Sequence, residues 1–361
     1  MVSFRGPLLR ALTKAGHEVY AFAMDYSMAS EEQVRELGAI PVRYALDRTG
    51  TNPFRDLHSI FLLRSLFRGF AIELVLSYFI KPIIYATIAA QLAGVRKRYA
   101  ILPGMGYVFT ESGRFPGWRH RALNTLLKGL LRYVFAKNER VFVYNTDDEQ
   151  ELQKLNLATS VQLKRVNGTG IDLQQYPQVA GRTSPVTFLL AARLLKEKGI
   201  REYAKAARSV KVKYPEARFV LLGGIDTNPG AINKDVVQAW VEEGVLEWPG
   251  YVTDIKPWLA DSSVYVLPSY REGVPRSTQE ALATGRPVIT TYAPGCKDTV
   301  CDGVNGFLVP IRDVEALAER MIRFITQPEL IKTMGDASRR LAEERFNVHA
   351  INRSLLEVMG L

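Results

Sequence analysis

The chain has 361 residues, of which 47% are hydrophobic and 23% charged, a balance typical of a folded globular protein and unlike that of disordered or fibrous chains. This length favours two domains over a single hydrophobic core. The only two cysteines, Cys296 and Cys301, are too few for a disulfide framework and lack a nearby histidine for zinc, so we interpret both as small residues of a reduced cytosolic protein.

The net charge of +10 is confined to the first part of the chain. Residues 1–140 hold 20 Lys and Arg against 10 Asp and Glu, whereas residues 141–361 hold 27 of each. The basic residues are scattered among Leu, Phe and Ile and match no nucleic-acid-binding module, so we predict no nucleic-acid partner. A basic surface mixed with apolar side chains favours an anionic membrane surface instead.

Short apolar runs alternate with amphipathic runs through the first half of the chain. The pattern begins with a helix, where a strand is expected first, so either the start is truncated or the first domain lacks its first strand, which would leave unpaired sheet edges. Helices are predicted at 4–16, 31–38, 57–68, 83–93 and 118–136, and strands at 17–24, 39–44, 73–78, 98–103 and 140–144. This alternation is typical of a parallel, doubly wound sheet.

The same alternation restarts after a Gly- and Gln-rich stretch at 167–183. Strands are predicted at 186–191, 218–222, 264–267 and 287–290, and helices at 199–214, 236–244, 277–284, 314–326 and 328–344. We therefore predict an α/β protein with two Rossmann-like domains, one spanning residues 1–176 and the other 177–346. A last helix within 347–361 is predicted to cross back to the first domain.

The segment 70–90 (FAIELVLSYFIKPIIYATIAA) is the longest apolar stretch. It contains Glu73, Lys81 and Pro82, and its uncharged runs fall short of the roughly 18–20 residues that a membrane-spanning helix needs. We interpret it as a buried strand followed by a buried helix. No secretory signal pattern is apparent at the N-terminus, which favours a cytoplasmic protein.

The segment 270–280 (YREGVPRSTQE) carries the most specific chemical pattern. Glu272 falls in a turn after a predicted strand, at the edge where parallel sheets bind ligands. Ser277 and Thr278 open the next helix, whose unpaired backbone amides favour an anion. Glu280 lies one turn further on, where its carboxylate can accept two hydroxyls of a ribose. A simple helix cap with a solvated glutamate is the alternative interpretation.

This E-x7-E pattern resembles that of glycosyltransferase family 4, whose members have the GT-B fold of two Rossmann-like domains facing across a cleft and transfer sugars with retention and without metal. Four further segments agree with the family in order and spacing, so the resemblance covers nearly the whole chain. They are NGTGID at 167–172, Arg193 with Lys198 and Gly199, the pair Gly223 and Gly224, and DGVNGFL at 302–308.

The resemblance implies roles for four charged residues. Arg193 and Lys198 would bind the donor diphosphate, and a departing phosphate needs such cations where no metal neutralises it. Glu280 would bind the donor ribose and Glu272 the hydroxyls of the transferred sugar. Glu272 as a nucleophile is an alternative; the family favours front-face transfer, with the leaving phosphate helping to deprotonate the acceptor.

The remaining donor contacts are also implied by the resemblance. The backbone amides of Gly273 and Val274 would join Glu272 at the sugar, and Tyr251 with Val252 would contact the base. The expected donor is a nucleotide sugar, with UDP favoured over GDP, and no metal or other cofactor is expected.

The first domain is expected to bind the acceptor. Within the family the chain is most similar to hexosyl and N-acetylgalactosaminyl transferases acting on undecaprenyl-diphosphate-linked glycans, which implies a lipid-linked saccharide acceptor in bacterial surface polysaccharide synthesis. A peripheral location on the inner face of the membrane would suit that acceptor. The expected acceptor-side residues are Lys81, Gly104, Gly106 and Tyr107. Two alternatives are a nucleotide-sugar epimerase of the same fold and a catalytically decayed, nucleotide-binding scaffold.

Overall fold

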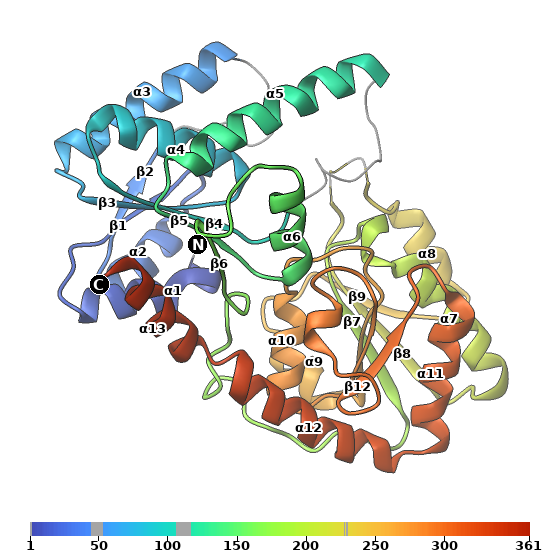
Figure 1. Ribbon diagram of the computed structural model, residues 1–361. Helices are drawn as coiled ribbons and strands as arrows, with labels where there is room; N and C mark the ends of the chain where they lie inside the picture. Colours follow the sequence, from blue (N-terminus) through green and yellow to red (C-terminus); the bar gives the residue numbers. More distant parts are fainter. Residues whose placement is uncertain (1, 45–52, 106–116, 227, 229) are drawn as a thin grey trace. The chain divides into compact units, whose positions relative to one another are not determined.

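A computed structural model describes residues 2–44, 53–105, 117–226, 228 and 230–361 of the chain (Figure 1). These residues form two compact units. The N-terminal unit consists of Met1–Thr169 together with His349–Leu361, and the C-terminal unit consists of Gly170–Val348. The C-terminal unit therefore begins at Gly170. The boundary predicted from the sequence lay a few residues later, at Pro177.

The N-terminal unit contains two separate parallel sheets. One pairs β1 (Tyr20–Ala23) with β2 (Ile40–Arg43), and the other has the order β3-β4-β5-β6. Its remaining strands are β3 (Leu74–Tyr78), β4 (Lys97–Leu102), β5 (Arg140–Val143) and β6 (Leu163–Arg165). Its helices are α1 (Val2–Lys14), α2 (Met28–Glu36), α3 (Pro53–Gly69), α4 (Ile80–Ala93), α5 (Gly117–Ala136), α6 (Thr146–Lys154) and most of α13 (Val348–Met359). Along the described chain no strand pairs β1 with β3.

The segment 70–90 supplies the middle of this unit. It forms β3 and most of α4, and helix α4 buries Ile83, Ile84 and Ala89 in the core that lies on the sheet. Its apolar character therefore reflects packing inside the unit. Among the described residues no helix combines the length and the hydropathy that crossing a membrane requires.

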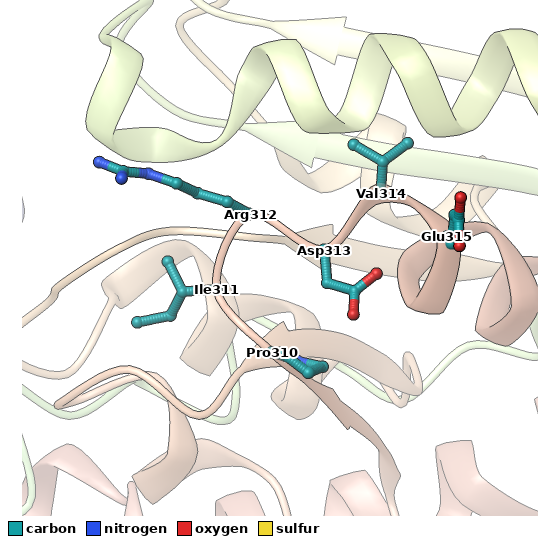
Figure 2. A pocket seen from close by; sticks show the side chains of 6 residues that line it. All are labelled: Pro310, Ile311, Arg312, Asp313, Val314 and Glu315. Carbon is teal, nitrogen blue, oxygen red and sulfur yellow. The ribbon is translucent and has the colours of Figure 1, made fainter.

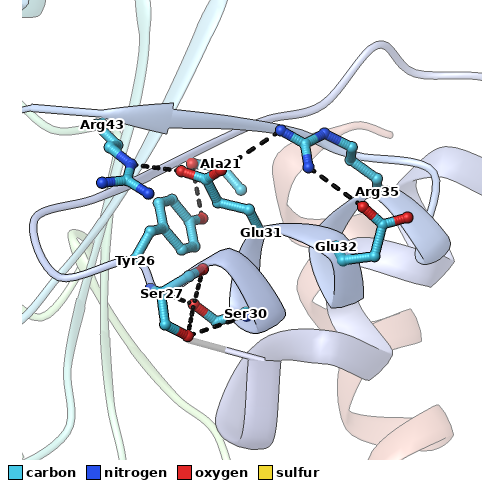
Figure 3. A network of polar contacts seen from close by, with 8 residues as sticks. All are labelled: Ala21, Tyr26, Ser27, Ser30, Glu31, Glu32, Arg35 and Arg43. Carbon is cyan, nitrogen blue, oxygen red and sulfur yellow. Dashed lines mark hydrogen bonds and ion pairs between the residues drawn. The ribbon is translucent and has the colours of Figure 1, made fainter.

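Helix α2 is fixed to its neighbouring strands by polar contacts (Figure 3). Ser27 and Ser30 form a capping box at the start of the helix, which satisfies backbone amides that have no helical partner. Glu31 on α2 accepts a 2.5 Å hydrogen bond from Nε of Arg43 on β2, and the hydroxyl of Tyr26 donates to the carbonyl of Ala21 on β1 at 2.8 Å. These contacts hold α2 against the two-stranded sheet.

The C-terminal unit has a single six-stranded parallel sheet with the order β12-β11-β10-β7-β8-β9. The strands are β7 (Thr187–Ala191), β8 (Arg218–Leu222), β9 (Glu247–Gly250), β10 (Val264–Leu267), β11 (Val288–Thr291) and β12 (Gly306–Val309). Around them lie α7 (Ile200–Lys213), α8 (Lys234–Glu242), α9 (Lys256–Asp261), α10 (Arg276–Ala283), α11 (Val314–Thr326) and α12 (Glu329–Arg345), with short 3-10 helices η2 (Lys196–Lys198) and η3 (Lys297–Thr299). Strand β10 is buried throughout, as central parallel strands are.

The predicted fold class, α/β with two Rossmann-like domains, is confirmed. Every helix and strand predicted from the alternation is present, with ends displaced by a few residues. The sequence missed α6, β6, α9, β9 and β12. All five are at most nine residues long, too short for a periodic pattern to become distinctive.

Candidate functional site

The candidate donor-site residues gather at the carboxyl edge of the C-terminal sheet. Lys198 ends η2, which follows β7, and Glu272 lies in the loop that follows β10. Strands β7 and β10 are hydrogen-bonded neighbours. Two segments separated by more than seventy residues in the sequence therefore leave the sheet side by side, at the edge where open parallel sheets bind ligands.

Lys198 and Glu272 form a largely buried ion pair. Nζ of Lys198 lies 2.5 Å from Oε1 of Glu272, and their side chains are 17% and 13% exposed. The hydroxyl of Ser269 donates to the same carboxylate oxygen at 2.8 Å. A short, charge-assisted contact of this kind fixes the positions of both heads more firmly than a solvated pair would.

Glu280 is held in a similar way on helix α10. Its Oε1 accepts from Nε of Arg276 at 2.9 Å and from the hydroxyl of Tyr176 at 3.0 Å. Glu280 is 8% exposed, and burying a carboxylate is costly unless it is paired and hydrogen-bonded, as this one is. The carboxylate also contributes to the raised pKa of the Tyr176 phenol, although burial is the larger cause.

Each glutamate is therefore anchored through one of its two carboxylate oxygens. The side-chain hydrogen bonds of Glu272 and Glu280 all end on Oε1, and Oε2 of each has no hydrogen-bond partner among the described residues. A carboxylate can accept several hydrogen bonds through its two oxygens. Each glutamate therefore keeps an oxygen with which to bind the hydroxyl groups of a ligand.

Arg193 has a different environment from Lys198. Its side chain is 67% exposed and its Nη1 lies 3.3 Å from Oδ2 of Asp226, in the loop after β8. In the part of the chain that the structure describes, no contact joins Arg193 to Lys198 or Glu272. Arg193 remains at the carboxyl edge, but as an exposed and loosely held cation, whose pairing with Lys198 on one diphosphate stays a prediction.

The expected base-contacting loop lies next to the glycine turn after β8. The amide of Gly223 donates to the carbonyl of Gly250 at 2.9 Å, and a Cβ built on Gly224 would lie 3.3 Å from the Cβ of Tyr251. Tyr251 is 76% exposed and Val252 is half-buried. An exposed aromatic ring beside a bare glycine backbone provides a surface on which a planar group can stack.

Gly273 and Val274 follow Glu272 in the loop after β10. Val274 is buried, and the loop is tightly enclosed by Gly295. Gly295 has φ +74°, and a Cβ there would lie 2.1 Å from the carbonyl oxygen of Gly273 and 2.3 Å from that of Glu272. Glycine at position 295 therefore allows the backbone to close over the segment that carries Glu272.

Gly199, directly after Lys198, is packed against neighbouring backbone even more closely than Gly295. It has φ +69°, and a Cβ at this position would lie 2.0 Å from the carbonyl oxygen of Pro268. We expect Gly199→Ala to displace η2 and to lower the free energy of unfolding by about 1–3 kcal/mol beyond the backbone strain. Urea denaturation and a UDP titration measure the two effects.

Gly244→Ala is the matched control for this substitution. Gly244 has φ +70°, but a Cβ there would meet nothing within 4 Å, so the variant reports the left-handed strain alone. Equal losses of stability in the two variants would show that the contact with Pro268 is unimportant.

The acceptor-side predictions fall in the N-terminal unit. Lys81, in the first turn of α4, lies 3.4 Å from Oδ1 of Asp56 and 5.6 Å from the ring centre of Tyr85. Gly104 follows β4 and is half-buried. Gly106 and Tyr107 lie outside the described residues. The common role of Lys81 and Gly104 stays a prediction.

Sequence reasoning missed Arg276, Tyr176 and Ser269 as parts of the site. Arg276 belongs to the motif at 270–280 and lies four residues before Glu280, which is the spacing of a helical ion pair, although the predicted helix began one residue later, at 277. The sequence therefore contained a signal for the contact between Arg276 and Glu280. Tyr176 lies about a hundred residues from Glu280 in the chain, and only the tertiary structure brings the two together.

A hollow of about 470 Å³ lies in the C-terminal unit, between β12 and α11 (Figure 2). It is lined by Pro310, Ile311, Arg312, Asp313, Val314 and Glu315. The guanidinium of Arg312 lies 4.7 Å from the ring centre of Tyr270, while Asp313 caps α11. None of the candidate site residues lines this hollow.

Two family models match successive parts of the chain. Residues 8–175 match the model described as Glycosyltransferase Family 4, and residues 185–327 match the one described as Glycosyl transferases group 1. Together they cover most of both units and all of the candidate donor residues. The chain belongs to glycosyltransferase family 4.

Proteins similar to this family 4 glycosyltransferase include other glycosyltransferases. N,N'-diacetylbacillosaminyl-diphospho-undecaprenol alpha-1,3-N-acetylgalactosaminyltransferase of Campylobacter jejuni is 25% identical over 91% of this chain and 87% of its own length. The putative colanic acid biosynthesis glycosyltransferase WcaL of Salmonella typhimurium is 30% identical, over 54% of this chain and 50% of its own. The crystal structure of Anabaena HepE in complex with UDP has a TM-score of 0.76 at 17% identity, covering 98% of this chain and 95% of that one. It shows the same GT-B fold.

Proposed function

We propose that this family 4 glycosyltransferase transfers a sugar, with retention, from a UDP-sugar to a lipid-linked saccharide in bacterial surface polysaccharide synthesis. The observation that carries the proposal is the pair of anchored glutamates beside Lys198, each with an unoccupied carboxylate oxygen. UDP bound to HepE and the acceptor named for the Campylobacter jejuni relative support the choice of donor and acceptor.

In this proposal Lys198 and Arg193 carry the charge of the diphosphate as the glycosidic bond lengthens. Fixed cations are most effective where charge develops, because they need no reorganisation during the reaction. Lys198 is held in place by Glu272, whereas exposed Arg193 can move toward the phosphates from its contact with Asp226. With these cations the transfer is proposed to need no metal.

Glu272 is proposed to bind hydroxyl groups of the transferred sugar through Oε2. Its negative charge is compensated at 2.5 Å by Lys198, which weakens it as a nucleophile. This pairing supports front-face transfer, in which a leaving phosphate oxygen accepts the proton of the acceptor hydroxyl. The amides of Gly273 and Val274 are proposed to complete the sugar contacts, and Tyr251 and Val252 those of the base.

The role of Glu280 as the ribose-binding residue can be tested with nucleotide analogues. We expect Glu280→Ala to weaken UDP binding by about 10–100-fold, because hydrogen bonds to a charged acceptor are lost. Wild-type protein should also lose affinity for 2′,3′-dideoxy-UDP, whereas the variant should bind the two nucleotides equally. Isothermal titration measures all four affinities.

Glu319→Ala, on the exposed face of α11, is the control for that series. A Glu280→Ala variant that still distinguishes UDP from the dideoxy analogue would exclude ribose binding by Glu280. A folded wild-type protein that binds no nucleoside diphosphate would end the proposal as a whole.

We propose that the N-terminal unit binds the acceptor at an anionic membrane surface. Helices α3 and α5 both pack on α4, and both have exposed apolar side chains. The exposed fractions are 51% for Leu57 and 50% for Phe61 on α3, and 70% for Leu126 and 45% for Tyr133 on α5. Arg132 and Arg68 are exposed on the same two helices. Apolar and basic side chains together are what an anionic lipid surface binds.

We expect Leu126→Ser to reduce co-sedimentation with phosphatidylglycerol vesicles by roughly fivefold, because an apolar side chain no longer enters the lipid. Phosphatidylcholine vesicles should bind neither form. Val212→Ser is the control, since Val212 is 81% exposed on α7 of the other unit. Equal loss in the two variants would assign the binding to general surface hydrophobicity.

A further inference from the structure

Arg5, in the second turn of α1, is a buried cation without an acidic partner. It is 8% exposed. Its Nη2 donates to the hydroxyl of Tyr144, its guanidinium carbon lies 4.4 Å from the ring centre of Tyr78, and its Nε has no hydrogen-bond partner. Within the described ranges no carboxylate forms an ion pair with it. Arginine is normally buried only when paired, so this arrangement calls for an explanation.

The three residues meet at the carboxyl edge of the four-stranded sheet. Tyr78 is the last residue of β3 and Tyr144 directly follows β5, the strands that flank β4. This edge is where open parallel sheets bind their ligands. Tyr78 is half-buried and is the most exposed of the three.

Tyr144 cannot neutralise the guanidinium. Complete burial raises the pKa of the Tyr144 phenol well above its ordinary value, so this group stays protonated and uncharged at neutral pH. The hydroxyls of Tyr78 and Tyr144 are 3.2 Å apart. Because the Tyr144 oxygen accepts from Arg5, its proton can be donated to Tyr78, which leaves the Tyr78 proton available for a ligand.

We propose that Arg5, Tyr78 and Tyr144 form an anion site that binds a phosphate oxygen of a substrate of the transfer reaction. An anion would supply the missing counter-charge, and the guanidinium and the Tyr78 hydroxyl would supply the donors. This inference rests on the proposed function, in which two substrates carry phosphate: the nucleotide donor and the diphosphate of a lipid-linked acceptor.

The test titrates farnesyl diphosphate in detergent, and separately UDP, into full-length wild-type protein, Arg5→Gln and Arg10→Gln. Arg10 lies on the same helix and is exposed, so its variant loses the same charge without touching the cluster. We expect Arg5→Gln to weaken farnesyl diphosphate binding by about tenfold or more, as loss of a charged hydrogen bond predicts. Arg10→Gln should bind as the wild type does.

The two ligands distinguish the source of the phosphate. Weaker farnesyl diphosphate binding alone assigns the site to the acceptor, and weaker UDP binding alone assigns it to the donor nucleotide. Unchanged affinity of a folded Arg5→Gln variant for both ligands overturns the anion site. Wild-type protein that binds farnesyl diphosphate but no UDP would instead contradict the proposed function and leave the Arg5 comparison valid.

Tyr144→Phe covers the case in which Arg5→Gln fails to fold. This change removes a single hydroxyl and keeps the ring, so the core around it is preserved. It is expected to weaken the same ligand as Arg5→Gln, by a smaller factor. If Arg5→Gln does not fold and Tyr144→Phe binds both ligands with wild-type affinity, the proposal is wrong.

Discussion

Lys198→Ala is expected to lower kcat by roughly 10²–10³-fold and to weaken UDP binding, because it removes the fixed ammonium that we propose compensates the leaving diphosphate. The substitution also leaves the largely buried carboxylate of Glu272 without its cation, since the two side chains are 17% and 13% exposed. Turnover is measured with the UDP-sugar that the wild type hydrolyses or transfers fastest, and affinity by titration with UDP.

Lys196→Ala is the matched control for this prediction. Lys196 lies on the same short helix, is exposed, and makes no ion pair among the described residues, so the two variants differ only in the placement of the lost charge. The control should keep wild-type kcat. If both variants lose turnover equally, the general positive field of the loop, and not the pair with Glu272, is responsible.

Glu272→Gln is expected to lower kcat by about 10–100-fold while UDP affinity stays close to that of the wild type. The substitution keeps the size of the side chain and can still accept from Ser269, but it removes the charge that we propose binds sugar hydroxyls through Oε2. UDP lacks the transferred sugar, so its binding should be insensitive to this residue.

The same measurement distinguishes two roles of Glu272. If the carboxylate only positions Lys198, Glu272→Gln will weaken UDP binding together with kcat, as Lys198→Ala does. Trapping of a glycosylated Glu272 in the wild type would contradict the front-face proposal and favour double displacement. Glu319→Gln, on the surface of α11, controls for the loss of one negative charge.

The sequence by itself determined the fold class and the family of this protein. The alternation of apolar strands and amphipathic helices requires only local periodicity, and it correctly placed long elements such as α7 and α11. Short elements such as β6 and β9, with three and four residues, carry too little periodic signal to be recognised.

The candidate residues Glu272, Glu280 and Lys198 were likewise apparent from the order and spacing of short motifs. The residues that contact them in the structure were not apparent from the sequence. The contact between Lys198 and Glu272 depends on β7 and β10 being neighbours in a sheet whose order differs from the chain order. The contacts of Tyr176 with Glu280 and of Arg5 with Tyr144 join residues more than a hundred positions apart.

Only the tertiary structure could decide these contacts, because burial and hydrogen bonding depend on which loops the sheet order brings together. A motif specifies which side chains are present, whereas the fold specifies which oxygen of each carboxylate is already occupied. For the same reason the sequence shows Arg5 as one of 47 basic residues, and the structure shows a buried guanidinium that lacks a counter-charge.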